Sequence, residues 1–203
     1  MSPEFGPKPI TLQGRHVLLT PLTLAHATDL LAAAADPEIW SYLPYQQPRT
    51  EPDMRALIES AERDQERGFS VAFAIVDLRS GKAIGSTRYL DIRPRDRGVE
   101  IGSTWLSSEV WRTAINTECK YLLLRHAFED LSALRVQLKT DERNQRSRAA
   151  ILGIGATFEG ILRCDRVLWN GFVRSSAYYS ITHQERPAVR AKLEERLNRP
   201  AGV

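Results

Sequence analysis

A polar residue pair at the expected start of a helix is the first candidate for chemistry. Asn144 is a favoured N-cap residue type, and Gly155 suits the left-handed conformation in which helices often end. Between them, Ser147, Ile151 and Ile154 recur at helical spacing, so they share one inward stripe with Ser147 at its polar end. The spacing predicts a helix entrance that faces a ligand. A capped helix with a purely structural role is the alternative.

A strand, a loop and a helix are predicted in succession near the middle of the chain. Val99 and Ile101 follow the two-residue period of a strand, whereas Leu124 and Phe128 follow helical spacing. A loop that brings free backbone N–H groups to a helix N-terminus favours anions, especially phosphates. Arg112 in this loop adds positive charge. The segment therefore predicts an anion-binding site.

Three arginines, Arg143, Arg146 and Arg148, cluster beside the Asn144 helix start. They can contact a phosphate, or they can form an ordinary solvated helix face. Over the whole chain, Lys and Arg exceed Asp and Glu by 28 − 25 = 3. This mild basic excess contains no run long enough to indicate nucleic acid binding.

Glu100 is a carboxylate in an otherwise apolar strand, which makes it a candidate general base. An ion pair with a neighbouring Arg is the alternative. His126 and His183 are also candidates, because imidazole titrates near neutral pH. The polar neighbours Arg125 and Glu129 instead favour a surface or capping role for His126.

Composition predicts one soluble globular domain, since the chain has 203 residues, of which 42% are hydrophobic and 26% charged. Cys119 and Cys164 lack the spacing of metal ligands, and a chain of this size needs no disulfide. No apolar run approaches the length of a membrane span, and the N-terminus lacks a signal-peptide layout. We therefore expect a cytoplasmic protein that binds neither a metal nor a membrane.

The periodicity predicts one mixed α/β domain of alternating strands and helices. A flexible leader is expected at residues 1–11, the domain at 12–183, and a C-terminal helix and tail at 184–203. Asn170-Gly171 is the strongest hairpin signal. Strands are predicted at 16–21, 70–78, 83–92, around Glu100, at 134–140, 157–168 and 172–182, and helices at 24–35, 51–67, after the loop, after Asn144 and at 185–197.

Several motifs occur in an order that is specific to one family. They are Arg143-Asn144-x-x-Ser147, Gly155-Ala156-x-x-Glu159-Gly160-x-x-Arg163, Trp169-Asn170-Gly171 and Ala177-Tyr178-Tyr179-Ser180. With the strand, loop and helix before them, they resemble the GNAT superfamily of N-acetyltransferases, in its ribosomal-protein (RimJ/RimL-like) branch. The resemblance covers residues 12–181. It implies a single GNAT-like domain with a central, mostly antiparallel twisted sheet of about seven strands flanked by helices.

The resemblance also implies a reaction. Acetyl-CoA is the expected co-substrate, with no metal, and its acetyl group passes directly to a primary amine in a ternary complex. The acceptor is a protein N-terminus or a small-molecule amine, and a homodimer is a possible assembly. A CoA-binding or regulatory module with weak catalysis is the alternative. The residues implied in CoA binding are Trp105, Leu106, Trp111, Arg112, Thr113, Ala114, Ile115, Asn116, Asn144 and Ser147.

The pyrophosphate loop differs from the general family pattern at Trp111, Ala114 and Asn116. Ala114 stands where the pattern has Gly, so it adds a Cβ where backbone approaches phosphate. Backbone N–H groups around Trp105 and Leu106 are expected to stabilise the tetrahedral oxyanion.

Ser147 is the implied proton donor to the departing thiolate, because the matching Ser of the branch lies near the thioester sulfur. A helix-end Ser bound to backbone is its alternative role. Glu100 is the candidate base, although relatives that use a hairpin Glu have it where Arg166 stands.

The acceptor pocket is expected between the first helices, where the resemblance implies Trp40, Tyr42 and Tyr45 as walls. Trp40 can equally be a core residue. Tyr178 and Tyr179 alternate along a strand, so one of them points inward.

Overall fold

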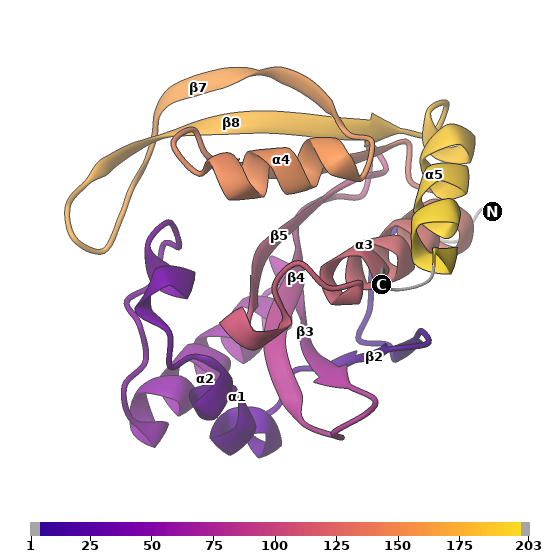
Figure 1. The fold of residues 1–203 in the computed structure, drawn as a ribbon. Helices are drawn as coiled ribbons and strands as arrows, with labels where there is room; N and C mark the ends of the chain where they lie inside the picture. The colour runs from indigo at the N-terminus through magenta and orange to yellow at the C-terminus, as the bar shows by residue number, and fades with distance from the viewer. Residues whose placement is uncertain (1–4, 200–203) are drawn as a thin grey trace.

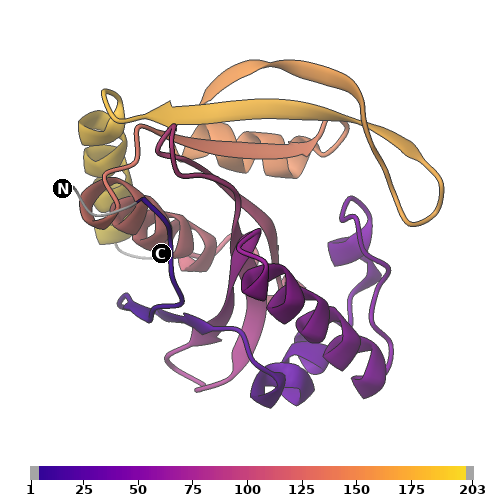
Figure 2. The same ribbon diagram turned by 180° about the vertical axis from the view of Figure 1, so that it is seen from behind.

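The computed structural model describes residues 5–199 and places them in two helical layers around one sheet (Figures 1 and 2). The leader at residues 1–4 and the end of the tail at 200–203 lie outside the described residues. Within the rest of the expected leader, Phe5 is buried in the core, so this part packs on the domain.

The sheet has eight strands in the order β1-β2-β3-β4-β5-β6-β8-β7, and all neighbours are antiparallel except β5 and β6. The predicted fold class is confirmed, with one strand more than expected. The additional strand β1 is too short for a periodicity to show in the sequence. The strands are β1 Leu12–Gln13, β2 Val17–Pro21, β3 Ser70–Asp77, β4 Ala83–Arg93, β5 Gly98–Leu106, β6 Arg135–Asp141, β7 Thr157–Val167 and β8 Val173–Thr182.

The helices start and end at residues whose chemistry explains their bounds. In α2, the Thr50 side chain accepts from Asp53 N–H in a capping box, and Met54, Ile58 and Ala61 form the buried stripe. The helices are η1 Leu24–His26, α1 Ala27–Ala33, η2 Pro37–Trp40, α2 Glu51–Glu66, η3 Ser108–Val110, α3 Ile115–Arg125, η4 His126–Asp130, α4 Gln145–Gly153 and α5 Arg186–Asn198. None of these described helices is long and apolar enough to cross a membrane.

The two faces of the sheet carry different apolar clusters. Helices α3, α4 and α5 pack on one face, where residues such as Leu122, Ile151 and Val189 meet side chains from most strands. Helices α1 and α2 pack on the other face, against residues of β3, β4 and β5 such as Ala74 and Trp105. Among the described residues, this second cluster includes none from β6, β7 or β8, so it ends at β5.

His126 corrects an expectation from the sequence. It is buried, and its Nδ1 lies 3.2 Å from the hydroxyl of Tyr89, which donates to the Leu123 carbonyl at 2.6 Å. The predicted surface or capping role is wrong because α3 continues into η4, a π-helical turn. A π turn changes the residue spacing, so ordinary helical periodicity assigns its faces incorrectly.

Candidate active site

The sheet forks between β5 and β6. The two strands pair only from Gly98–Glu100 to Arg135–Gln137, after which β5 continues along β4 and β6 continues along β8. Ser107 N–H bonds to the Ile84 carbonyl of β4 at 2.8 Å. Because backbone groups alternate along a strand, the N–H and C=O of Leu106 point the other way, toward the fork. The predicted donor at Leu106 therefore faces the opening.

A β-bulge lies on β5 just past the fork. Gly102 to Trp105 on β5 oppose Arg88 to Ser86 on β4, so β5 carries one extra residue there. Ser103 adopts a positive φ of 47°, and its hydroxyl lies 2.7 Å from the hydroxyl of Tyr45. Bulges bend strands and redirect side chains, and they are frequent beside active sites.

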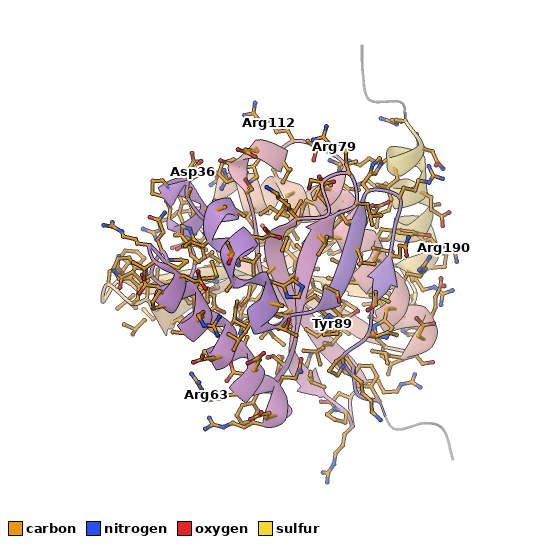
Figure 3. All side chains as sticks on the ribbon, turned by 90° about the horizontal axis from the view of Figure 1, so that it is seen from below. Asp36, Arg63, Arg79, Tyr89, Arg112 and Arg190 are labelled. Carbon is orange, nitrogen blue, oxygen red and sulfur yellow. The ribbon has the colours of Figure 1, made fainter. Side chains whose placement is uncertain are left out.

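The loop between β5 and α3 is open at the N-terminus of the helix. Residues 112–114 are exposed, and the Arg112 side chain projects from the surface (Figure 3). The positive φ of 63° falls on Arg112, whereas Ala114 has an ordinary helical φ of −68°. The Cβ of Ala114 thus causes no backbone strain. The Ile115 N–H at this helix end bonds to Thr113 Oγ1 at 3.3 Å. The N–H groups of the first turn beyond it, with the adjacent Arg, fit a diphosphate.

Trp111 is held against β5 and is covered by an arginine. Its indole Nε1 donates to the Leu106 carbonyl at 3.1 Å. The guanidinium of Arg146, from the start of α4, lies 3.5 Å from the centre of the Trp111 ring and also pairs with Glu38 at 3.0 Å. Arg146 therefore joins the loop after β5, helix α4 and the η2 segment.

The predicted start of α4 is present. The Asn144 side chain accepts from the backbone N–H of Ser147 at 2.9 Å, which is an N-cap contact. Ser147 is half-buried, and Ile151 and Ile154 below it are buried. The cap uses only the backbone N–H of Ser147, so it leaves the hydroxyl available.

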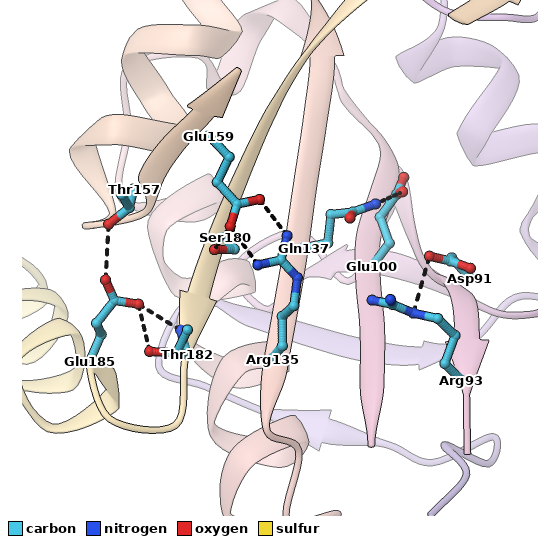
Figure 4. A network of polar contacts seen from close by, with 10 residues as sticks. All are labelled: Asp91, Arg93, Glu100, Arg135, Gln137, Thr157, Glu159, Ser180, Thr182 and Glu185. Atoms are coloured by element: carbon cyan, nitrogen blue, oxygen red, sulfur yellow. Dashed lines mark hydrogen bonds and ion pairs between the residues drawn. The ribbon is translucent and has the colours of Figure 1, made fainter. Parts of the chain in front are cut away.

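Glu100 lies at the vertex of the fork with 2% of its surface exposed. Its Oε2 accepts from Gln137 Nε2 at 3.0 Å (Figure 4) and lies 3.2 Å from Lys139 Nζ. The ion pair considered from the sequence exists, but its cation is Lys139, not an Arg. A Cβ at Gly102 would lie 2.7 Å from Glu100 Oε1, so only glycine leaves room for the carboxylate.

Further polar side chains continue from Glu100 across the neighbouring strands. Lys139 Nζ lies 5.5 Å from the ring centre of Tyr178, whose hydroxyl donates to Asp165 Oδ1 at 3.1 Å. Burial, and then the Asp165 hydrogen bond, raise the pKa of Tyr178 to about 12. Glu100, Lys139, Tyr178 and Asp165 are called the polar row below. Lys139 was not identified from the sequence, although it alternates with the buried Val136 and Leu138 of β6.

The three aromatic residues predicted as acceptor walls occupy different environments. Trp40 is buried, its ring centre lies 5.1 Å from that of Trp105, and its Nε1 donates to the Ala34 carbonyl, so it is a core residue. Tyr42 and Tyr45 are half-buried, and the Tyr45 hydroxyl contacts that of Ser103 just past the fork. The Tyr42 carbonyl accepts from Arg174 Nη1 at 3.4 Å.

The clustered arginines do not form a plain solvated face, because each of them contacts another segment. Arg143 pairs with the buried Asp141 at 2.7 Å and lies 3.8 Å from the ring centre of Phe172. Arg148 donates through Nε to the hydroxyl of Tyr179 at 3.0 Å. With the contacts of Arg146 described above, each arginine connects α4 or its entrance to another segment.

Comparisons with known proteins agree with this geometry. Residues 16–157 match a family model described as an acetyltransferase (GNAT) domain. A crystal structure of an acetyltransferase candidate from T. thermophilus is 39% identical, with a TM-score of 0.86, and the match covers 94% of this chain and 98% of that one.

Two further solved structures are similar. A GCN5-related N-acetyltransferase from Brucella melitensis is 27% identical over 97% of this chain and 89% of that one, with a TM-score of 0.91. RimJ of Mycobacterium smegmatis, in complex with CoA-disulfide, is 19% identical over 93% and 95% of the two chains, with a TM-score of 0.80, and shares the fold. A search of curated proteins gives no match.

Proposed function

The chain belongs to the GNAT acetyltransferase family, and on that premise we propose that it transfers an acetyl group from acetyl-CoA directly to a primary amine. The acceptor is the N-terminus of a protein or a small-molecule amine. One observation carries the proposal: the fork at Glu100 adjoins a strand edge with free backbone donors and an open helix N-terminus.

The co-substrate would supply an activated acetyl thioester. Arg112 and the first turn of α3 would hold its diphosphate, because helix N-termini and basic side chains favour anions. The backbone N–H of Leu106 points toward the fork and would stabilise the negative charge on the tetrahedral oxygen. Asn144 and Ser147 would line the opposite side, where α4 begins.

Proton transfer is the second requirement. An amine with a pKa near ~10 is mostly protonated at neutral pH and must lose a proton before it attacks. We assign this task to Glu100, directly or through a water, because its carboxylate lies at the vertex of the fork beside the polar row. Ser147 would donate a proton to the departing thiolate, whose pKa is near ~8.5.

The acceptor would approach from the face that carries α1 and α2. Tyr42 and Tyr45 would line this approach together with Lys139 and Tyr178. Trp40 is not included, because it is buried in the core.

A CoA-binding module without turnover is the second candidate function. The engagement of Glu100 with Lys139 favours it, because the ion pair occupies a carboxylate oxygen that would otherwise be available to the amine. Isothermal titration with acetyl-CoA, followed by a free-thiol release assay over a panel of amines and N-terminal peptides, separates the two. Binding with amine-dependent thiol release supports the enzyme. Binding without release for any acceptor supports the module, and no binding rejects both.

A further inference from the structure

A lysine lies in the interior of the molecule at a position that the proposed mechanism does not use. Lys120 of α3 has 7% of its surface exposed. Its ammonium donates to the hydroxyl of Thr104 on β5 at 2.7 Å, and that hydroxyl lies 2.7 Å from the hydroxyl of Thr87 on β4. Both threonines therefore face α3.

The charge of Lys120 has no counterion within residues 5–199, since none of their carboxylates lies within salt-bridge distance of the ammonium. The nearby Glu118 instead accepts three backbone N–H groups from residues 15–17. Burial lowers the pKa of Lys120 to about 8, so the group is still mostly protonated at pH 7. An ammonium has three donors, and Thr104 accepts one.

The place of Lys120 relates it to the site described above. Thr104 lies on the part of β5 beyond Glu100, where β5 has left β6. Lys120 follows Asn116 by four residues, which is about 6 Å along the helix axis. The ammonium thus lies between the anion-binding end of α3 and the fork. A nucleotide-linked thioester that joined these two points would run along this part of β5.

We propose that Lys120 binds the pantetheine arm of the co-substrate, with its ammonium donating to an amide carbonyl oxygen of that arm while Thr104 holds its orientation. This proposal rests on the proposed function, because it takes acetyl-CoA as the ligand. A ligand oxygen would satisfy a donor that the protein leaves without an acceptor, which accounts for a buried charge that otherwise only costs stability.

Two ligands and two variants test the proposal. Lys120→Met keeps the apolar stem of the side chain and removes the ammonium, and Lys192→Met, on the exposed side of α5, is the matched control. Titration with acetyl-CoA reports the whole ligand, and 3′-phosphoadenosine 5′-diphosphate reports the nucleotide without the pantetheine arm. We expect Lys120→Met to weaken acetyl-CoA binding by about 10- to 100-fold, the effect of one charge-assisted hydrogen bond. Binding of the nucleotide should change by less than about twofold in either variant.

Unchanged acetyl-CoA affinity in folded Lys120→Met overturns the proposal, and so does an equal loss for both ligands, which would place the ammonium at the diphosphate. If Lys120→Met does not fold, Lys120→Gln carries the same comparison with an intermediate loss, and full affinity in that variant is equally contradictory. Failure of the wild-type protein to bind acetyl-CoA would reject the proposed function itself, which is a different result.

Discussion

Glu100 illustrates how a single carboxylate at the fork can serve chemistry, structure or both. Its contacts with Lys139 and Gln137 would hold it in place in either case. A base and a structural ion pair respond differently when both charges are removed together. A double-mutant cycle therefore distinguishes the two roles.

Glu100→Gln should lower kcat by roughly 100-fold, as expected for loss of one acid–base group. It should also destabilise the fold, because Lys139 loses its carboxylate partner. In Glu100→Gln with Lys139→Met, we expect stability to recover in urea unfolding while activity stays low. Recovery of activity together with stability would show that Glu100 acts only as a partner of Lys139.

Ser147→Ala should slow acetyl transfer by roughly 100-fold and leave acetyl-CoA affinity nearly unchanged. The N-cap contact survives, because it uses the backbone N–H of Ser147. Asn144→Ala is the contrasting variant and should lose about 1 kcal/mol of unfolding free energy. Steady-state kinetics and thermal melts measure both. Wild-type turnover in Ser147→Ala removes its hydroxyl from the mechanism.

Lys120 also makes a prediction about stability. Its pKa is lowered from 10.5 to about 8 in the folded protein, so burial costs roughly 3 kcal/mol below pH 8, where both states are protonated. Between pH 8 and 10.5 the unfolded state binds more protons, so this cost declines as pH rises. Lys120→Met should therefore be more stable than wild type at pH 7, and the difference should shrink toward pH ~10. A constant difference across this range would contradict the lowered pKa.

At the scale of single residues, residue type and spacing identified Asn144 as a helix cap and Glu100 as a carboxylate in an apolar strand. They did not show which side chains these residues contact. Asn144 was identifiable because an N-cap depends on a local sequence pattern. Lys139 and Lys120 were not, because their roles come from strands and a helix that are distant in the sequence. Ala114 looked unfavourable in the sequence, yet the backbone strain lies at Arg112.

At the scale of secondary structure, the shape of strand β5 positions Glu100 at the fork. The bulge at Ser103 and the absence of a side chain at Gly102 let the strand turn away from β6 while Glu100 stays at the vertex. Because the interior is close-packed, one added methyl group at Gly102 would displace the Glu100 carboxylate.

Gly102→Ala should reduce activity by at least about tenfold, because the new Cβ would lie 2.7 Å from Glu100 Oε1 and 2.9 Å from Leu90 Cδ1. Gly153→Ala, at the end of α4, is a suitable control, since its nearest neighbour is the flexible end of Arg196 at 3.1 Å. Thiol release and thermal melts are the measurements. Equal activity in the two variants would mean that the carboxylate can move without consequence.

Periodicity predicted most elements, and their bounds agree within a few residues. The hairpin around Asn170-Gly171 was identifiable because a turn dipeptide is a local signal. The β1 strand and the η4 turn were not. The first is very short, and the second breaks the helical spacing on which the prediction of His126 depended.

The stability of the whole molecule depends on two apolar clusters on opposite faces of one sheet. His126 is buried beside the larger cluster, and its ring centre lies 5.8 Å from that of Tyr89. Burial lowers its pKa below 6.5, against a smaller opposing effect of Asp130. The sequence predicted the α/β class and the mostly antiparallel sheet. It could not predict that the α1 and α2 cluster ends at β5, because the extent of this cluster depends on how the two helices pack on the sheet.

His126 should make global stability depend on pH. The unfolded protein takes up a proton on this group near pH 6.5, whereas the folded protein does so only at lower pH, so stability should fall as pH drops below about 6.5. The slope from one such group is at most about 1.4 kcal/mol per pH unit. His126→Phe should flatten the dependence of the urea midpoint between about pH 5 and 7. An unaltered slope in this variant would assign acid sensitivity to other groups.

The half-sheet formed by β6, β8 and β7 (Figure 1) carries Lys139, Tyr178 and Asp165 of the polar row on a face that the α1 and α2 cluster does not reach among the described residues. A substrate whose amine reaches Glu100 from this side can keep the rest of its bulk outside. The enzyme should then tolerate bulky substrate groups that lie far from the reacting amine. It should discriminate between acceptors only by the groups within the first few bonds of that amine. If the proposed function holds, this geometry would favour an acceptor amine at the end of a longer chain over a small molecule that is enclosed completely.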